Sequence, residues 1–533
     1  MRITNKVMQN NSLRNVNNNK VLQDKLNTQI ATGKKVDKPS DDPVVAIRSL
    51  RLRSDVSQID QYLNKNIEDA SSWLQLTESS AKQTIAAVTN MIEQCETGAS
   101  DQYTVKDKLI MVDSLRELKN EVYRTGDADY AGRYIFTGYR TNTSLSFGNE
   151  AKNQKYTISQ SFSFEDLETM NYVDTGNLMD ITKANFESHT GDVVENNMKS
   201  MTYYRFRLGY DDLDSTMSGQ AELIASLRNL NLKDASGNPL AISPRLETDS
   251  GAAYTAAAAA SEPGSANPLY LAVIPSTGEV VMSKEVYDAI NNAKNADGTH
   301  QTLYVDYNKT KWQNSDLRPE HYYYCRTVVP DSSVPGGQKT VEYNKEYRDT
   351  GVWDQPIEYK VGFNQSVQVN SYAADIYATA IGRDIDEITD LADKLTGVLD
   401  QVDMLKSMKE DTVNYGSQAQ QAAIDTELDA ASKAQTYLTD LLQRTFSKYI
   451  TKMQGYLDTA NESITEMGNR GKQLDLIKNR LSDQQTTFKE LQSDNEDADI
   501  TEVAVQLSSA QVSYEAALMA TSKMIQTTLL NYL

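Results

Sequence analysis

With 533 residues, the chain is longer than a single hydrophobic core normally serves, so two to four domains are expected. The formal net charge of -21 argues against nucleic acid and anionic membranes as partners. The only cysteines, Cys95 and Cys325, lie in different kinds of sequence, which argues against a disulfide framework. No apolar run approaches the ~20 residues of a membrane span, and the first residues lack the apolar core of a cleaved signal, so neither is expected.

The first 32 residues are polar and rich in asparagine, with a sparse apolar row at helical spacing. We expect this segment to be disordered unless a partner buries the row. Over residues 1–53 basic residues outnumber acidic ones, which indicates either a solvated face or an attraction to acidic surfaces of neighbours. The row consists of Ile3, Val7, Leu13, Val16, Leu22, Leu26 and Ile30.

A helix stop and a helix start follow one another. Gly33 suits the left-handed conformation that ends many helices, with Lys34 and Lys35 near the negative helix end. Asp42 suits the N-cap of the next helix and Pro43 its first position. From Val44 to about Glu96, apolar residues step by threes and fours along one long helix. A break at Thr97–Ser100 and a second helix over about 105–125 predict a helical hairpin.

The middle of the chain has a different character. The stretch Tyr134–Tyr139 reads as a strand, and residues 141–370 carry most of the prolines, together with short β-rich runs and turn signals. Two short helices are expected near 220–230 and 284–294, and the alanine run over 252–260 reads as a surface helix or a linker. The β-rich runs cover residues 155–159, 269–274, 302–307 and 358–361. The segment therefore reads as one or two β-rich domains inserted into a helical protein.

After residue 370 the helical pattern returns in three runs, over about 385–405, 428–446 and 464–488. An acidic cluster over 494–499 precedes a last helix from Thr501, where carboxylates complement the positive helix end. The apolar tail of that helix either docks on the chain's own core or forms a face for another subunit. Two chain ends with complementary stripes predict an α+β fold, in which both ends form a long α-helical coiled-coil bundle and the β-rich domain is inserted in the middle.

The sequence shows no recognisable set of catalytic residues. His189, His300 and His321 are the only histidines and lack metal spacing, so each reads as a surface or turn residue. The stretch Gly468–Lys472 lacks the spacing of a phosphate loop. The acidic cluster lacks the glycine and terminal glutamate of a calcium loop and reads as a helix start. We therefore predict no enzyme, no cofactor and no metal, although an enzyme or binding module carried by the insert stays the competing class of function.

Both ends resemble the flagellin-like family of flagellar hook–filament junction proteins. The resemblance rests on Met1–Thr4, Gln29–Val36 and Pro39–Pro43 at the start, on Tyr134–Tyr139, and on Asn479–Leu481, Ser493–Ile500 and Thr528–Leu533 at the end. It covers roughly residues 1–147 and 365–533. The Ser-Asp-Asp-Pro form favours a junction protein over true flagellin, and the insert is longer than is typical of the family.

The resemblance implies a structural subunit of the bacterial flagellum that joins hook to filament. It implies secretion, without cleavage, through the flagellar type III export channel to the extracellular flagellum. The partners would be neighbouring copies of the chain, the other hook-associated junction protein, hook protein or flagellin, and an export chaperone. A filament-forming flagellin variant is the alternative.

The same resemblance implies a division into three parts. Residues 1–43 and 494–533 would form an inner layer of terminal coiled-coil helices, residues 44–147 and 365–493 a helical bundle, and residues 148–364 the outer β-rich insert of one or two subdomains. The predicted subunit-interface residues are Val7, Leu22, Leu26, Ile30, Val503, Leu507, Tyr514, Leu518, Ile525 and Leu529.

Overall fold

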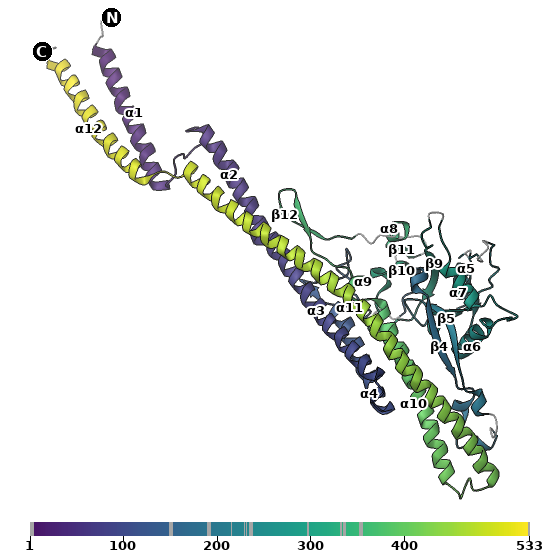
Figure 1. Ribbon diagram of the computed structural model, residues 1–533. Coiled ribbons are helices and arrows are strands. Elements are labelled where there is room, and N and C mark those ends of the chain that lie inside the picture. Colours follow the sequence, from purple (N-terminus) through teal and green to yellow (C-terminus); the bar gives the residue numbers. More distant parts are fainter. Residues whose placement is uncertain are drawn as a thin grey trace. The chain divides into compact units, whose positions relative to one another are not determined.

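The structure is a computed structural model, and it divides the chain into two compact units (Figure 1). The first unit comprises Met1–Ser72, Glu358–Val367 and Arg470–Leu533, and the second comprises Trp73–Ile357 and Gln368–Asn469. The residues that the structure describes are 5–148, 153–188, 193–214, 216–228, 230, 232–233, 238–295, 298–330, 333, 337–350 and 355–530.

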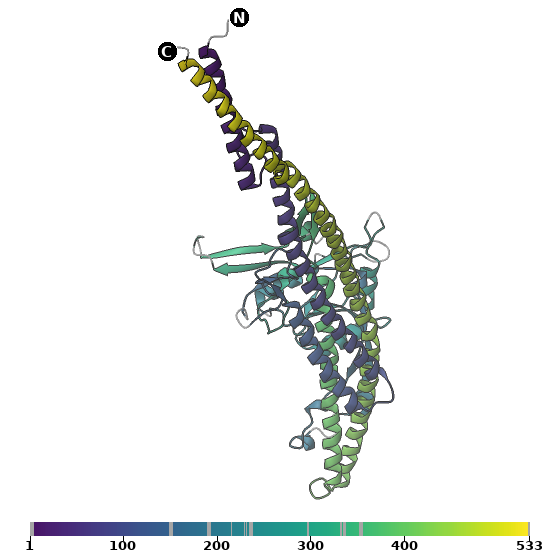
Figure 2. The same cartoon turned by 90° about the vertical axis from the view of Figure 1, so that its left-hand side faces the viewer.

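The first unit is built from helices at both ends of the chain. Helix α1 and helix α12 lie side by side and antiparallel, so that the two chain ends lie at the same end of the pair (Figure 1, Figure 2). A short hairpin of β12 and β13 adds to this unit, with β12 packed near the π-helical turn η1. The elements are α1 (Asn5–Thr32), α2 (Pro43–Gln61), η1 (Tyr62–Ile67), β12 (Glu358–Gly362), β13 (Gln365–Gln368) and α12 (Ile500–Leu530).

Two long helices carry residues of both units. Helix α3 (Glu68–Ala99) continues α2 and η1 in one helical path, and α11 (Gln418–Glu496) runs for 79 residues. The last two predicted helical runs, over 428–446 and 464–488, therefore belong to one helix. Gly468 and Gly471 lie inside it, and a β-carbon at either position would meet no neighbouring atom within 4 Å.

The helical part of the second unit adds α4 (Val105–Gly126), α9 (Ala373–Ile376) and α10 (Thr379–Glu410) to its portions of α3 and α11. Helix α4 begins with a capping box between Thr104 and Asp107 and packs against α10. Lys119 on α4 pairs with Asp386 on α10, and the buried Tyr123 hydroxyl accepts a hydrogen bond from the Gly382 amide at 2.7 Å. The buried apolar positions of α10 recur at helical spacing, as the sequence predicted.

The β-rich part of the second unit contains two larger sheets. One has the strand order β11-β10-β3-β9 and is antiparallel throughout; the other has the order β4-β5-β8-β7-β6, with only β6 and β7 parallel. The strands are β1 (Asp129–Tyr130), β2 (Arg133–Tyr134), β3 (Tyr156–Phe162), β4 (Glu168–Asp174), β5 (Lys199–Arg207), β6 (Arg245–Leu246), β7 (Leu271–Ile274), β8 (Glu279–Met282), β9 (Leu303–Lys309), β10 (Tyr324–Pro330) and β11 (Gln338–Tyr343).

Short helices surround the sheets. They are η2 (Phe164–Asp166), η3 (Leu178–Asp180), η4 (Phe186–Ser188), η5 (Glu195–Asn197), α5 (Met217–Arg228), α6 (Ser250–Ala260), α7 (Lys284–Asn291), η6 (Pro319–His321) and α8 (Lys345–Thr350). The core between them joins residues of both larger sheets, including Ile158, Phe206 and Val305. Gly278 closes the β7–β8 turn with a positive φ of 62°, and a β-carbon at this position would lie 2.0 Å from the Tyr210 carbonyl oxygen, so a side chain would clash.

The predicted α+β class is confirmed, because long helices precede and follow the β-rich middle along the chain. Local helix signals also hold. Asp42 caps α2 by accepting from the amides of Val44 and Val45, Pro43 occupies the first turn, and Gly33 has a φ of 69°.

Two expectations differ from the structure. In the stretch Tyr134–Tyr139, the strand ends at Tyr134, and the following residues form bends and a turn. The alanine run belongs to α6, and Ala253 and Ala257 are fully buried against the five-stranded sheet instead of lying at the surface. Residues 5–32 form a helix that packs against α12 of the same chain, which is consistent with the expectation that this segment needs a partner.

Candidate assembly surface

The contact between the two terminal helices is made by one apolar seam. Leu26, Val503 and Ala510 are 3%, 7% and 6% exposed and form a single cluster. Ile30 and Leu507 are half-buried and pack against it. The positions on α12 alternate by four and three, which is the spacing of a coiled-coil seam.

The ten predicted interface residues fall into three groups. Leu26 and Val503 are buried in the seam, and Ile30, Leu507 and Tyr514 are half-buried. Three others remain exposed: Val7 (48%), Leu22 (45%) and Leu518 (43%). Ile525 and Leu529 lie on helix α12, but their side chains lie outside the described part of the chain. Part of the predicted set is thus used within the chain, and part remains accessible; its role between subunits stays a prediction.

An ionic joint connects the segments next to the terminal pair. Glu496, at the end of α11, accepts hydrogen bonds from Ser49 and Arg53 on α2 and forms an ion pair with Lys34. Lys34 also donates to Asp497 at 2.5 Å, and the Lys35 amide donates to the Glu496 carbonyl at 2.7 Å. The joint therefore fixes the turn after α1 to the turn before α12.

Electrostatics favour the charged form of this joint. The hydrogen bonds from Arg53 are the main reason that the pKa of Glu496 is lowered to about 2. The Asp497 carboxylate in turn raises the pKa of Lys34. Because Glu496 is 5% exposed, loss of its partners would leave a buried charge.

The acidic cluster has two roles, of which the sequence indicated one. Asp499 caps α12 by accepting from the amides of Thr501 and Glu502, as expected for an acidic helix start. Glu496 and Asp497 belong instead to the ionic joint. The available signal was the basic excess over residues 1–53, which supplies Lys34 and Arg53; these two pair with acids of the same chain.

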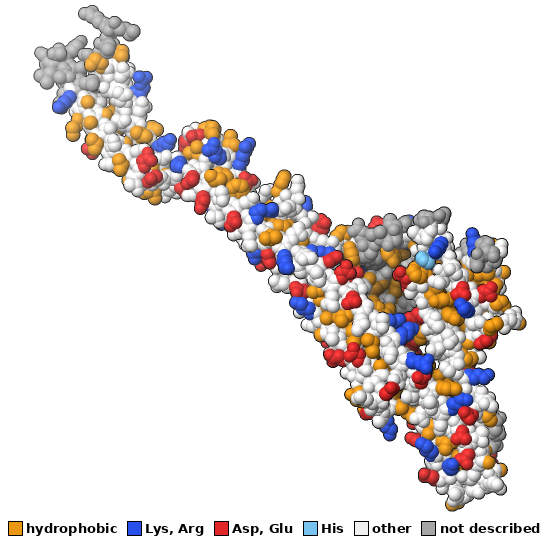
Figure 3. Space-filling model, in the orientation of Figure 1, with side chains coloured by type: hydrophobic (Ala, Val, Ile, Leu, Met, Phe, Trp, Pro, Cys, Tyr) orange, Lys and Arg blue, Asp and Glu red, His pale blue; other side chains and the backbone are white. Residues whose placement is uncertain are grey.

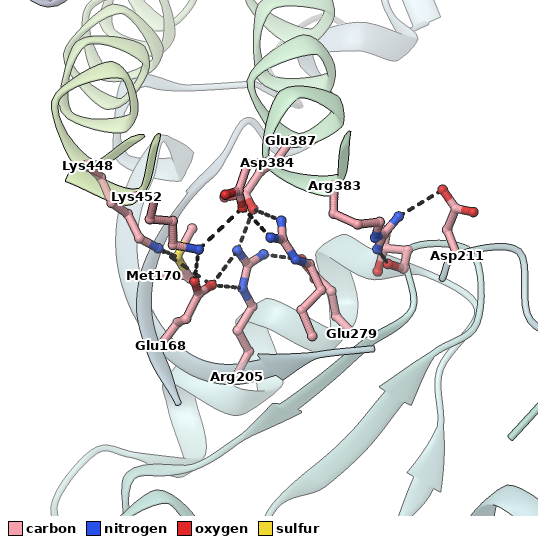
Figure 4. A network of polar contacts seen from close by, with 12 residues as sticks. Glu168, Met170, Arg205, Asp211, Glu279, Arg383, Asp384, Glu387, Lys448 and Lys452 are labelled. Carbon is pink, nitrogen blue, oxygen red and sulfur yellow. Dashed lines mark hydrogen bonds and ion pairs between the residues drawn. The ribbon is translucent and has the colours of Figure 1, made fainter. Parts of the chain in front are cut away.

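A second charged cluster anchors the five-stranded sheet to α10 and α11 within the second unit (Figure 4). Arg205 on β5 is 1% exposed and pairs with Glu168, Glu279 and Glu387. Lys452 on α11 pairs with both Glu168 and Asp384. Figure 4 shows these side chains converging from the sheet and from two helices. Sequence reasoning singled out none of them, because the partners are far apart in the chain.

The electrostatic balance of this anchor favours ionised carboxylates. Burial alone would raise the pKa of Glu387, but the guanidinium groups of Arg205 and Arg207 outweigh burial and bring the pKa to about 2. The Arg205 guanidinium likewise outweighs burial at Glu168 and holds its pKa well below the ordinary value. Glu168 and Glu387 are therefore held in their charged form by the arginines that they contact.

The histidines do not form a site in the described part of the chain. His189 lies outside the described residues. His300 is half-buried and stacks on Phe164, with ring centroids 3.8 Å apart. His321 was expected to be a surface or turn residue, and it lies in the short helical turn η6 but is only 3% exposed. Its Nε2 lies 3.0 Å from the Ser144 carbonyl, and burial lowers its pKa to about 3.

The described residues contain no group of three or more His, Cys, Asp or Glu side chains placed to hold a metal ion. Their helices also include none with the length and apolar character needed to cross a bilayer. Cys95 and Cys325 are both buried free thiols.

Comparison with known sequences supports the resemblance seen at the N-terminus. Residues 3–141 match the family described as the bacterial flagellin N-terminal helical region. Flagellar hook-associated protein 3 of Escherichia coli (strain K12) and that of Salmonella typhimurium (strain LT2) are each 28% identical over 145 residues. Each match covers 27% of this chain and 45% of the relative, so the chain spans about half the length of these curated relatives.

Solved structures also align with most of this chain, at low sequence identity. The flagellar junction protein FlgL from Legionella pneumophila aligns with 85% of this chain and 100% of its own, at 8% identity and a TM-score of 0.28. FlgL from Xanthomonas campestris aligns with 81% of this chain and 98% of its own, at 9% identity and a TM-score of 0.25. The chain is thus similar in sequence to the bacterial flagellin N-terminal helical region over residues 3–141 and to flagellar hook-associated protein 3 over 145 residues.

Proposed function

We propose that this chain is a structural subunit of the bacterial flagellum that joins hook to filament. Its terminal helices would pack as coiled coils with those of neighbouring subunits. The observation that carries the proposal is the terminal helix pair: it closes one apolar seam within the chain and still presents Val7, Leu22 and Leu518 to solvent. Exposed apolar residues on a helical pair favour association with further helices.

The three-part division belongs to the same proposal. Residues 1–43 and 494–533 would form the inner layer, residues 44–147 and 365–493 the surrounding bundle, and residues 148–364 the outward domain. The ten interface residues would all serve the contact between subunits. Those at exposed positions would touch the neighbouring subunit, and those at buried positions would hold the helix pair in the shape that the neighbour binds. The chain would work as a building block and not as an enzyme.

Partners and location follow from the proposed role. The neighbours would be further copies of the chain, the other hook-associated junction protein, and hook protein or flagellin, with an export chaperone before secretion. The chain would leave the cell through the flagellar type III export channel and act at the hook–filament junction outside it. The match to the flagellin N-terminal helical region also keeps a filament-forming flagellin variant as the second candidate.

The test uses a chain that ends after Asp499 and so lacks α12. Purified full-length and truncated proteins are added to isolated hooks, and their incorporation at the hook tip is followed by electron microscopy. We expect the truncated chain to keep the unfolding transition of its second unit but to be missing from hook tips. Normal incorporation of the truncated chain would count against the proposal. Growth of long filaments from the full-length protein alone would favour the flagellin variant.

A further inference from the structure

Helix α12 carries a second apolar row besides the seam that packs against α1. Val505, Val512 and Met519 are 67%, 64% and 67% exposed, and each is seven residues from the next. A seven-residue repeat keeps side chains on one face of a supercoiled helix. We call these three residues the outer row; Figure 3 shows apolar side chains exposed along the terminal helices.

The outer row lies on the side of α12 that faces away from α1. Its members follow the seam positions Val503 and Ala510 and the half-buried Ala517 by two residues each. Two residues correspond to a turn of about 200° around the helix axis, so the two rows lie on nearly opposite faces. One apolar face is therefore covered within the chain, and the other faces solvent.

Helix α1 has the same arrangement. Gln9, Val16 and Gln23 are half-buried and continue the seam of Leu26 and Ile30 at a spacing of seven. The residues two positions before them face the other way and are exposed: Val7, Arg14 and Val21. The exposed fractions of the two valines are 48% and 69%.

The two outward faces differ in charge. On α12, Glu502 lies three residues before Val505, and Glu515 lies three residues after Val512. Both are exposed, and this spacing places them beside the outer row. Arg14 lies between the two valines of α1, and Lys25 lies four residues after Val21 on the same face. Asp24, three residues after Val21, is the one acidic residue beside this row in the described part of α1, so the face carries two basic residues and one acidic residue. Lys523 is the one basic residue beside the outer row in the described part of α12.

We propose that the outer face of α12 in one copy packs against the outer face of α1 in a second copy. This inference rests on the proposed junction role, and it states which face of a second copy covers each exposed face. Because the two faces lie on opposite sides of the helix pair and carry complementary charge, the contact is head-to-tail and repeats around a ring or along a helix. A two-fold contact between identical faces would place like charges together.

The register of the contact follows from the helix pair itself. Leu26 packs with Val503, and Arg14 and Glu515 each lie twelve residues farther along their own antiparallel helices. A neighbour displaced sideways therefore brings its Glu515 level with Arg14. Arg14 has one hydrogen bond within its own helix, to Asn11 at 3.3 Å, and its remaining donors are available to a partner.

The first experiment measures self-association of the purified full-length chain by sedimentation equilibrium over a concentration series. The double variant V505D/V512D is expected to raise the dissociation constant at least about tenfold, because it places charges in an apolar contact. The matched control Q506D/S513D adds the same charges one residue along, about 100° away around the helix. The control should associate like the unmodified chain, and circular dichroism should give both variants the same helix content.

The second experiment exchanges charges between copies. R14E alone and E515R alone each create a like-charge contact in a head-to-tail assembly, so each protein should associate about threefold or more weakly. An equal mixture of the two should associate more tightly than either alone, since every contact between unlike chains then joins opposite charges. A two-fold contact through α12 predicts instead that R14E associates like the unmodified chain, because Arg14 on α1 then lies outside the contact.

The inference is overturned if V505D/V512D associates as tightly as Q506D/S513D, if mixing gives no gain, or if the unmodified chain stays monomeric up to about 1 mM. These outcomes are separable from the proposed function. If the chain associates through these faces but does not join isolated hooks, the junction role is wrong and the contact stands. If the V505D/V512D protein assembles normally on hooks, only the proposed contact is wrong.

Discussion

The guanidinium of Arg53 donates two parallel hydrogen bonds to the carboxylate of Glu496, from Nε to Oε1 at 2.8 Å and from Nη2 to Oε2 at 2.6 Å. This fork links α2 to the end of α11, 443 residues apart in the chain. A bidentate arginine–carboxylate pair fixes orientation as well as distance. The fork therefore stabilises the joint from which the terminal helix pair extends.

Glu496→Gln should loosen this joint. The substitution removes the charge that Arg53 and Lys34 share, at a cost of about 1–3 kcal/mol. The effect should be local, so the measurement is amide hydrogen exchange in α1 and α12, where protection should fall. Asp494→Asn is the matched control, because Asp494 is exposed and contributes its backbone carbonyl, not its side chain, to the contact with Lys35. Equal protection in both variants would show that the joint does not hold the pair.

Arg205→Ala should destabilise the second unit strongly. It leaves Glu168, Glu279 and Glu387 partly buried without their shared cation, and breaking such a cluster costs about 3–5 kcal/mol. Chemical denaturation followed by fluorescence measures the change. Arg444→Ala is the control: its pair with Asp440 is 68% and 56% exposed, so a loss of no more than about 0.5 kcal/mol is expected. Similar losses in the two variants would contradict the anchoring role of Arg205.

Sequence reasoning could predict features that depend on neighbouring residues, but not contacts between residues far apart in the chain. Asp42, Pro43 and Gly33 were predictable because helix caps depend on residues a few positions apart. The class of the fold followed from periodicity, which is also local. The partners of Arg205 lie 37, 74 and 182 residues away, and no local pattern marks them.

The terminal helices show the same limit at a finer scale. Apolar spacing identified Leu26 and Val503 together with Leu22 and Leu518, but it could not separate the buried members from the exposed ones. That separation depends on which face of α12 meets α1. The prediction of a surface position for the alanine run was wrong for a related reason. Small side chains allow α6 to lie close to a sheet, but composition alone does not show that a sheet lies beside it.

His321 should make the second unit less stable in mild acid. Its pKa lies near 3 in the folded chain, against 6.5 for an unperturbed histidine, because burial disfavours the imidazolium. The unfolded chain therefore binds the proton first, and the contribution of the neutral ring is present above pH 6.5 and lost as the pH falls toward 3. Between pH 7 and pH 5 the loss should be about 2 kcal/mol.

Urea unfolding of the unmodified chain and of His321→Gln at pH 7, 6 and 5 checks this prediction. The other titrating groups contribute to both proteins, so the difference between the two curves isolates His321. Glutamine keeps a donor for the Ser144 carbonyl but does not titrate. The stability gap should narrow or reverse in favour of the variant as the pH falls; parallel curves would show that His321 does not cause the dependence.

Leu26 and Leu22 separate the role of the seam from that of the exposed face. Leu26 is 3% exposed and Leu22 is 45% exposed, one helical turn apart on α1. Leu26→Ala should cost about 2–3 kcal/mol of local stability, because it opens a cavity between α1 and α12. Leu22→Ala should leave the isolated chain unchanged within about 0.5 kcal/mol and weaken only assembly on hooks. Hydrogen exchange of the α12 amides measures the first effect and incorporation at hook tips the second. If Leu22→Ala exposed the α12 amides as much as Leu26→Ala, the division of the terminal helices into an inner and an outer face would be wrong.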